Sequence, residues 1–199
     1  TPVEWFGDSS GWQAGTPDRN GRFAVGFAGT EVGDAALTLA GAHNRANALA
    51  ALAAARHAGV PPSVSLGALG TFRGVKRRLE FRGQVRGVTV IDDFAHHPTA
   101  IEVTIAGLRA RVGSARILAV LEPRSNTMKL GTMKARLPAA LAAADRVYCY
   151  CKGLGWDAAE ALRPLQDRAA AFEDLDGLVA AVIAEARAGD QVLVMSNGG

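Results

Sequence analysis

The pattern that most constrains the fold is an alternation of short apolar runs and amphipathic segments from about residue 77 onward. The run 117–121, Ile-Leu-Ala-Val-Leu, is continuous, as in a strand that is buried on both faces. Similar runs at 146–151 and 191–195 follow segments with helical spacing of apolar residues. Strands that alternate with helices form βαβ units in a mostly parallel sheet. The sequence therefore predicts an α/β, Rossmann-like domain.

The other elements of this part follow from the same reasoning. Two paired strands are expected at 79–81 and 88–91, joined near Gly83 and Gly87. Pro98 suits the first turn of a helix whose apolar face continues to Val112. Further helices are expected at about 132–143, 156–162 and 175–183.

The first part of the chain is organised differently. Apolar runs at 22–28 and 34–40, bounded by Gly, Asp and Asn, indicate strands. A helix is expected from about 44 to 57, and a shorter helical segment begins at Pro61-Pro62. Because the pattern changes at 71–76, we expect two parts, residues 1–71 and residues 72–199.

Composition excludes several classes of protein. Hydrophobic residues make up 49% and charged residues 21%, as in a globular protein and not a disordered one. No apolar run approaches the roughly 20 residues that span a bilayer, and no signal peptide is visible. Cys149 and Cys151 are too close in sequence for an ordinary disulfide, so we expect reduced thiols in or beside a core strand. These features fit a cytoplasmic protein without a membrane partner.

The charge is less decisive. The net charge is +3, and the densest basic stretch runs from Arg73 to Arg86 with two phenylalanines in it. Such a stretch is compatible with a nucleic-acid interface, with a solvated strand face, or with phosphate binding. Phosphate binding is the sharper of these readings, and no nucleic-acid partner is expected.

Three polar segments follow expected strands: Asp92-Asp93-Phe-Ala-His96-His97, Glu122-Pro-Arg124-Ser-Asn126, and Ser196-Asn197-Gly198-Gly199. Ligands of doubly wound sheets bind at the carboxyl ends of the strands. A carboxylate there can accept bonds from a ribose, and an arginine can clamp a carboxylate. The two histidines could bind phosphate, a carboxylate or a metal, but adjacent histidines point apart and no further ligands are evident. The sequence therefore predicts a ligand site here, and no metal site.

Two more motifs carry candidate residues. His43 and Asn47 share a face near the start of the first long helix with Asn44, where an amide can read an adenine edge. Asn44 could instead only cap that helix. The guanidinium groups of 73–78 could stabilise a transferring phosphoryl group, or could simply solvate a linker.

Taken in order, these segments resemble the Mur ligase family. The resemblance lies in Gly41-x-His43-Asn44-x-x-Asn47, Phe72-x-Gly74-x-x-Arg77-Arg78, Asp93-Phe-Ala-His96-His97-Pro98-Thr99 and Pro123-Arg124, and it covers nearly all of residues 22–199. Within the family, the three polar segments look most like the members that recycle murein tripeptide. Residues 1–71 would then be the tail of the central ATP-binding domain, and residues 72–199 the C-terminal domain, truncated at its end.

The resemblance implies an ATP-dependent ligation of UDP-N-acetylmuramate to L-alanyl-γ-D-glutamyl-meso-diaminopimelate through an acyl phosphate. It places His43, Asn44 and Asn47 near adenine, Asp93 near the ribose, and Arg78 near the γ-phosphate. His96 or His97 would lie near phosphate or the nascent bond. Arg124, Asn126, Ser196 and Asn197 are the candidates for holding the incoming peptide.

The departures from the family pattern also matter. These 199 residues contain no Gly-x-x-Gly-Lys-Ser/Thr P-loop, and the Mg²⁺ ligands that the family carries are expected upstream. We therefore expect this polypeptide alone to be inactive. The alternatives are a ligase that adds free L-alanine to UDP-N-acetylmuramate and a non-catalytic module that binds nucleotides or muropeptides.

Overall fold

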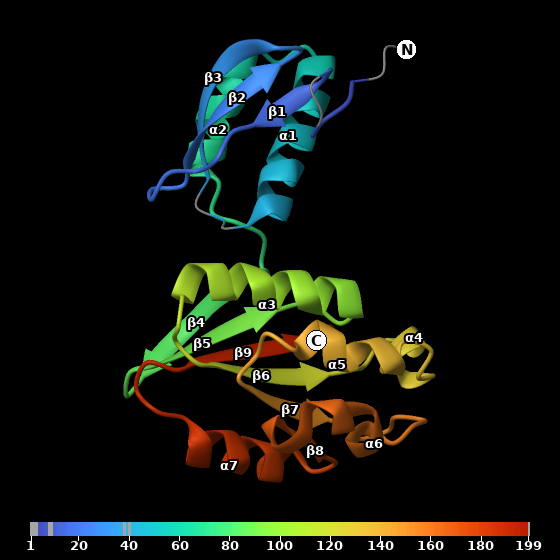
Figure 1. The fold of residues 1–199 in the computed structure, drawn as a ribbon. Coiled ribbons are helices and arrows are strands. Elements are labelled where there is room, and N and C mark those ends of the chain that lie inside the picture. Colours follow the sequence, from blue (N-terminus) through green and yellow to red (C-terminus); the bar gives the residue numbers. More distant parts are fainter. Residues whose placement is uncertain (1–3, 8–9, 38, 40, 199) are drawn as a thin grey trace. The chain divides into compact units, whose positions relative to one another are not determined.

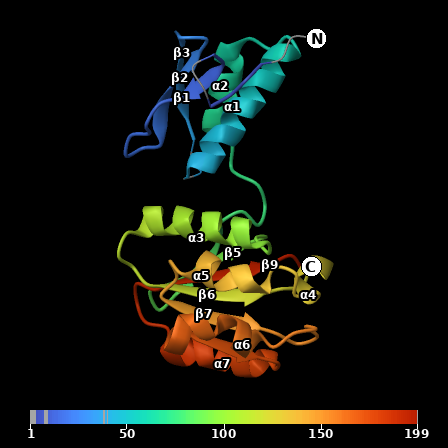
Figure 2. The same cartoon turned by 45° about the vertical axis from the view of Figure 1, so that its right-hand side comes forward.

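The computed structural model describes residues 4–7, 10–37, 39 and 41–198. The chain forms two compact units, Thr1–Gly74 and Val75–Gly199, and each is described by itself (Figures 1 and 2). The division falls three residues after the boundary expected at 71/72.

The first unit is a small antiparallel sheet covered by two helices. Its strands are β1 (Trp12–Ala14), β2 (Arg22–Phe27) and β3 (Thr30–Ala36), in the order β1-β2-β3. Helices α1 (Ala42–His57) and α2 (Pro62–Thr71) lie against this sheet (Figure 1). The core is built from one face of the sheet and from both helices: Trp12, Phe23, Val25, Ala35, Leu37, Ala48, Leu49, Leu52 and Leu66.

One expected strand of this unit is displaced. The run 34–40 was expected to be a strand, whereas β3 begins at Thr30 and ends at Ala36. Ala28 and Gly29 both have positive φ, 49° and 77°, as a two-residue hairpin turn requires. The turn fixes where β3 starts, and this local constraint outweighs the apolar pattern. Residues 38 and 40 lie outside the described part of the chain.

The second unit is a six-stranded sheet in the order β4-β5-β9-β6-β7-β8. Strand β4 pairs antiparallel with β5, and the other pairs are parallel, which confirms the predicted α/β class with a mostly parallel sheet. The strands are β4 (Glu80–Val85), β5 (Val88–Asp93), β6 (Ile117–Glu122), β7 (Arg146–Tyr150), β8 (Ala169–Phe172) and β9 (Gln191–Ser196).

Helices cover both faces of this sheet. On one face α3 (Pro98–Val112), α5 (Leu137–Leu141) and α6 (Ala158–Leu162) contribute to a large apolar core around Ile101, Ile105, Leu121 and Leu193. On the other face α7 (Leu175–Glu185) packs through Leu178 against Leu118, Tyr148 and Val192. The remaining helical turns are α4 (Asn126–Lys129), η1 (Lys134–Arg136) and η2 (Arg163–Arg168).

The helix expected at 132–143 is shorter in the structure. The chain forms the 3-10 turn η1 at 134–136, which continues into the short helix α5 at 137–141. Gly131 has a φ of 74°, which ends α4, and a turn at 131–133 delays the start of helical structure until Lys134. The strand β8 was not expected because its sequence, Ala-Ala-Ala-Phe, has little intrinsic strand preference.

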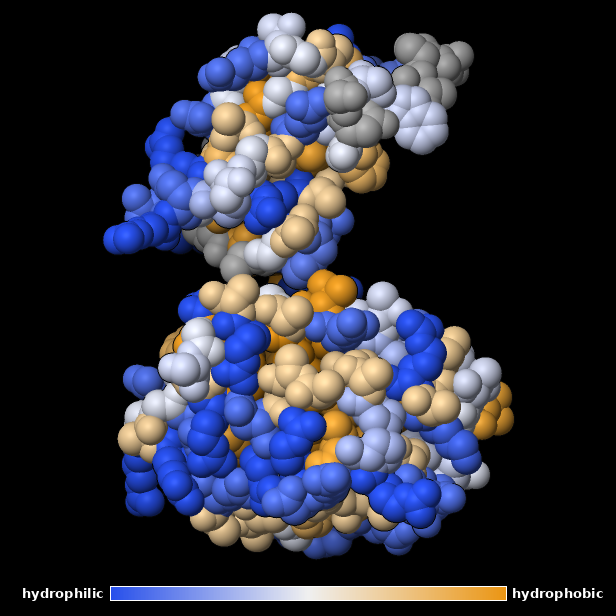
Figure 3. Space-filling view, viewed as in Figure 1, coloured by the Kyte–Doolittle hydropathy of each residue, from blue (hydrophilic) through white to orange (hydrophobic). Residues whose placement is uncertain are grey.

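No helix among the described residues is long and apolar enough to cross a membrane. The visible face of the second unit mixes hydrophilic side chains with smaller apolar areas (Figure 3). Such a surface is ordinary for a folded domain, since apolar atoms supply a large share of any protein surface.

The amino-terminal edge of the parallel sheet is held by an ion pair. Arg109 donates to Asp145 Oδ2 at 2.5 Å and to the carbonyl of Ala115 at 2.6 Å. The same carboxylate oxygen accepts from Ile117 N at 2.7 Å. Burial alone would raise the pKa of Asp145, but these two hydrogen bonds outweigh it and the pKa lies below its ordinary value of 3.8.

This lowered pKa gives stability a definite pH dependence. The carboxylate stabilises the fold above the unfolded-state pKa of 3.8, and its contribution is lost as the pH falls through the lower folded-state value. We expect the difference in the free energy of unfolding between wild type and Asp145→Asn to be constant near neutral pH and to become smaller below about pH 4. Urea unfolding at a series of pH values measures this difference. A difference that stays constant at acid pH contradicts the stabilising role of the Asp145 carboxylate.

Candidate functional site

The three polar segments lie side by side at the carboxyl edge of the sheet. Strand β9 runs between β5 and β6, so the ends of all three strands are neighbours. In the register, Asp93 pairs with Met195 and Glu122 pairs with Ser196. Residues 102 and 74 positions apart in sequence thus meet at one edge, where ligands of parallel sheets bind.

Asp93, at the end of β5, is buried. Its exposed fraction is 2%, and its oxygens accept from Leu79 N at 2.8 Å, Ala95 N at 2.8 Å and Thr104 Oγ1 at 3.3 Å. These three bonds fix the turn after β5 and the segment that leads into β4. A carboxylate so enclosed is poorly placed to contact a ribose, which argues against the role expected for Asp93.

Arg77 ties the ends of β5 and β9 together. Its guanidinium donates to Asp92 Oδ2 at 3.2 Å, to the carbonyl of Ser196 at 2.6 Å and to the carbonyl of Gly198 at 2.5 Å. Its own backbone N–H donates to Glu80 Oε2 at 2.8 Å, and this bond holds the pKa of Glu80 below its ordinary value. Sequence reasoning counted Arg77 among the guanidinium groups that could stabilise a phosphoryl group or solvate a linker. It did not find these acceptors, because they lie up to 121 residues away.

The turn after β9 is further organised by side chains from β6. Ser196 Oγ donates to Glu122 Oε2 and accepts from Gly198 N at 3.0 Å. The guanidinium of Arg124 lies against Gly198, where an added Cβ would stand 2.5 Å from Arg124 Nη1. Arg124 is half-exposed and pairs only loosely with Glu122, at 3.9 Å. The Oδ1 atom of Asn197 is buried and has no hydrogen-bond partner among the described residues.

A second group of side chains surrounds Phe94. The guanidinium carbon of Arg77 lies 5.3 Å from the ring centroid and that of Arg78 lies 5.9 Å from it. The ring of His96 meets Phe94 edge to face at 5.7 Å. The structure thus brings Arg78 and His96 to one aromatic residue, with the Arg78 side chain exposed. Phe94 was quoted in the sequence motif but was not expected to organise these groups.

The two adjacent histidines differ in their hydrogen bonds. His96 Nδ1 lies 3.1 Å from the carbonyl of Phe94, which fits a donating Nδ1–H and leaves Nε2 with a lone pair. His97 caps helix α3, and its Nδ1 accepts from Thr99 N at 3.3 Å, so the proton of a neutral ring belongs on Nε2. With neutral rings, His96 therefore presents Nε2 as a hydrogen-bond acceptor, and His97 presents Nε2–H as a donor.

The short helix after Arg124 carries the remaining candidate of this unit. Asn126 is exposed and begins α4, whose cap is Ser125 Oγ, accepting from Met128 N at 3.4 Å. Trp156 Nε1 donates to the carbonyl of Met128 at 2.7 Å and so holds this turn from the following segment. The role expected for Asn126, contact with the incoming peptide, stays a prediction.

The adenine candidates lie in the first unit. Helix α1 is capped by Gly41, with a φ of 105°, so Asn44 is not its cap as one reading allowed. His43 and Asn44 lie half-buried in the first turn, and Asn47 is exposed one turn later. The three therefore share one end of the helix, but they do not belong to the unit that holds the other candidates.

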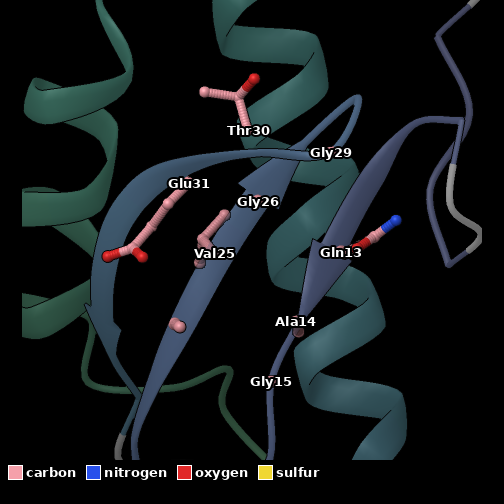
Figure 4. A pocket seen from close by; sticks show the side chains of 9 residues that line it. Gln13, Ala14, Gly15, Val25, Gly26, Gly29, Thr30 and Glu31 are labelled. Atoms are coloured by element: carbon pink, nitrogen blue, oxygen red, sulfur yellow. The ribbon is translucent and has the colours of Figure 1, made fainter.

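A pocket in the first unit has a volume of about 320 Å³ and is open to solvent. It lies over the small sheet, where Gln13, Gly26, Thr30 and Glu31 are among the lining residues (Figure 4). None of the residues expected to bind a ligand lines it, so it does not enter the site described here.

The cysteines and the possible metal ligands bear on the chemistry. Cys149 and Cys151 are free, as expected, and burial raises the pKa of Cys149 to about 12, which makes it an inert core thiol. Burial also raises the pKa of Cys151. No group of three or more His, Cys, Asp or Glu side chains that could hold a metal occurs in the described residues.

The central strands of this α/β domain end in arginine, imidazole and amide groups, which are side chains of the kind that contact anionic ligands in proteins. Residues 77–198 match the family model described as Mur ligase, glutamate ligase domain. The chain therefore belongs to the Mur ligase family, whose members are ATP-dependent ligases.

Relatives of this chain include two curated proteins named UDP-N-acetylmuramate–L-alanyl-γ-D-glutamyl-meso-2,6-diaminoheptandioate ligase. The Escherichia coli protein is 48% identical over 98% of this chain and 44% of its own length. The Haemophilus influenzae protein is 45% identical over 98% of this chain and 42% of its own length.

The crystal structure of a murein peptide ligase from Psychrobacter arcticus is similar in fold as well. It is 35% identical, with a TM-score of 0.72, over 98% of this chain and 43% of that chain. Relatives named UDP-N-acetylmuramate–L-alanine ligase match at lower identity or over a shorter part of the chain. The chain thus spans less than half the length of the two curated ligases from Escherichia coli and Haemophilus influenzae.

Proposed function

We propose that this chain is part of an ATP-dependent ligase that joins UDP-N-acetylmuramate to the tripeptide L-alanyl-γ-D-glutamyl-meso-diaminopimelate in murein recycling. The observation that carries the proposal is the 48% identity, over 98% of the chain, to a relative of that name. The polar edge at the ends of β5, β9 and β6 supports it, because this edge gathers groups suited to carboxylates and phosphates. A ligase that uses ATP and a UDP-sugar fits the cytoplasm.

In this proposal, one group of residues contacts ATP and accepts the proton of the incoming amine. Arg78 is exposed and suited to the γ-phosphate of ATP, since a guanidinium keeps its charge and binds phosphate oxygens in pairs. The incoming amine must lose a proton before it forms the amide, and His96 Nε2 is a candidate acceptor. Residues 1–71 would supply the adenine contacts through His43, Asn44 and Asn47, as the tail of the central ATP-binding domain.

The peptide would lie at the other side of the edge. Arg124 is half-exposed and beside the turn after β9, where it can clamp a carboxylate of the tripeptide. Asn126, Ser196 and Asn197 are the further candidates. The buried Oδ1 of Asn197 is an acceptor for which an ammonium or amide N–H of the ligand would be a partner.

The Mg²⁺ ligands are expected upstream of these 199 residues, and no described residue is assigned to the metal. We assign no step to a metal here. The role of Asp93 also changes in the proposal: its burial and three internal bonds make it a residue that shapes the edge, in place of a ribose ligand.

The proposal is tested by phosphate release from the full-length parent protein with UDP-N-acetylmuramate and ATP. The tripeptide and free L-alanine are offered as rival amines. Turnover with the tripeptide but not with alanine is expected. Turnover with alanine alone would instead support an alanine-adding ligase, and turnover with neither would favour a non-catalytic module that binds nucleotides or muropeptides.

The isolated 199-residue chain is expected to show no ATP-dependent ligation, because it contains no P-loop. The control is the full-length protein at the same concentration under the same conditions. The chain itself is checked for folding by circular dichroism, so that inactivity is not read from an unfolded sample. Ligation by the folded chain would overturn this expectation.

A further inference from the structure

We propose that Arg77 is a positioning residue that holds the turn at 196–198 in the shape that binds the incoming peptide. The role of that turn in peptide binding rests on the proposed function. The role of Arg77 in shaping the turn rests on geometry and is tested separately.

One guanidinium satisfies three acceptors from two strand ends. The Nε atom donates to Asp92 Oδ2, Nη2 to the carbonyl of Ser196 and Nη1 to the carbonyl of Gly198, at 3.2, 2.6 and 2.5 Å. The turn therefore has two of its carbonyls fixed by the same planar group. A guanidinium presents its donors in a rigid fork, so these acceptors must keep a fixed mutual geometry.

Arg77 is itself held in place at several points. Its N–H donates to Glu80 Oε2 at 2.8 Å, and its carbonyl accepts from Phe94 N at 2.8 Å. Its φ is 59°, in the left-handed region that a non-glycine residue adopts at a cost. Because backbone and side chain are both fixed by other segments, Arg77 acts as a rigid anchor for the turn.

The two neighbouring arginines have different surroundings. Arg77 is half-buried and its guanidinium donates to protein acceptors, whereas Arg78 is exposed beside the ring of Phe94. Arg78 is therefore the one that can meet a ligand. Arg77 acts on the ligand only through the turn, which makes it a positioning residue and not a catalytic one.

The position of the turn also determines where the guanidinium of Arg124 can lie. Gly198 N donates to Ser196 Oγ at 3.0 Å, and Ser196 Oγ in turn donates to Glu122. Gly198 lies close enough to Arg124 that an added Cβ would stand 2.5 Å from Nη1. A displaced turn would therefore move the guanidinium that clamps the peptide. Displacements of about 1 Å are enough to weaken such a site strongly.

The test compares Arg77→Gln and Arg77→Lys with a matched control, Arg109→Gln. Arg109 likewise bonds one carboxylate and several carbonyls, of Gly113, Ala115 and Ala143, but at the opposite edge of the sheet. The control therefore loses the same kind of contacts without touching the turn. Two readouts are measured: amide hydrogen exchange at Asn197 and Gly198 in the 199-residue chain, and steady-state kinetics of the full-length protein.

In Arg77→Gln we expect exchange at Asn197 and Gly198 to become at least about tenfold faster, since bonds to a charged donor are lost. The KM for tripeptide is expected to rise about tenfold or more, with the KM for ATP within about twofold of wild type. Arg77→Lys keeps the charge but not the fork, so partial recovery is expected. Arg109→Gln should lower the melting temperature and leave both readouts near wild type.

Unchanged exchange at the turn in Arg77→Gln overturns the proposal. So does an equal rise in the KM for ATP and for tripeptide, because that result means a general loss of structure. If Arg77→Gln fails to fold, the same readouts on Arg77→Lys decide the question. If the wild-type enzyme shows no tripeptide-dependent turnover, the proposed function fails, and hydrogen exchange alone still decides the role of Arg77.

Discussion

In the Asp93→Ala variant, the free energy of unfolding of the Val75–Gly199 unit is expected to fall by about 3–5 kcal/mol. Asp93 is 2% exposed, and its loss leaves Leu79 N, Ala95 N and Thr104 Oγ1 without their acceptor. Each buried donor without a partner costs about 1–3 kcal/mol, although part of this is recovered if water enters. The expected loss is a large share of the stability of an ordinary domain.

The measurement is urea denaturation of the 199-residue chain, followed through NMR signals of residues 75–198. Asp93→Asn keeps one acceptor oxygen, so its free energy of unfolding should fall less than that of the alanine variant. Asp176→Asn, at an exposed position on α7, is the matched control and should change stability little. The free energy of unfolding of Asp93→Ala could equal that of wild type while the full-length variant loses affinity for ATP. That result would mean that Asp93 binds the nucleotide, and its structural role would be wrong.

Replacing Arg124 by alanine in the full-length protein is expected to lower kcat/KM for the tripeptide about a hundredfold. The guanidinium is half-exposed beside Gly198, and its ion pair with Glu122 is long, at 3.9 Å. It is therefore available to form two parallel bonds with a ligand carboxylate, and alanine removes both. The KM for ATP should change little, and so should the melting temperature, because Arg124 has few contacts within the fold.

Gly198→Ala tests the same contact from the other side. The new methyl group would stand 2.5 Å from Arg124 Nη1, the end of a flexible side chain that can move aside at little cost to stability. A smaller loss of kcat/KM for the tripeptide, in the same direction, is expected. Arg111→Ala, an exposed arginine on α3, serves as the charge control. Equal losses in Arg111→Ala and Arg124→Ala would show a general effect of charge and contradict a specific clamp.

The sequence predicted the elements whose signal is local. The apolar runs of β6 and β9, Pro98 at the start of α3 and the polar segments after the strands are properties of a few adjacent residues. The helix expected at 132–143 forms only at 134–141, with a 3-10 first turn, because a turn follows Gly131.

The roles of individual residues at the site were less predictable. Asp93 looks like a ligand-binding carboxylate in sequence because it follows a strand and precedes a histidine pair. Its donors include Leu79 and Thr104, which are 14 and 11 residues away, and only folding buries it among them. Arg77 and Arg78 look alike in sequence, yet Arg77 donates to protein acceptors and Arg78 is exposed.

The sequence by itself determined the α/β class, the Mur ligase family and the identity of the polar segments, because these depend on residue types and their spacing. Only the tertiary structure decided that β9 lies between β5 and β6, so that the end of the chain's last strand meets Arg77 and Glu122. Strand order, burial and hydrogen-bond partners depend on pairing between residues up to 121 positions apart, which no local pattern specifies.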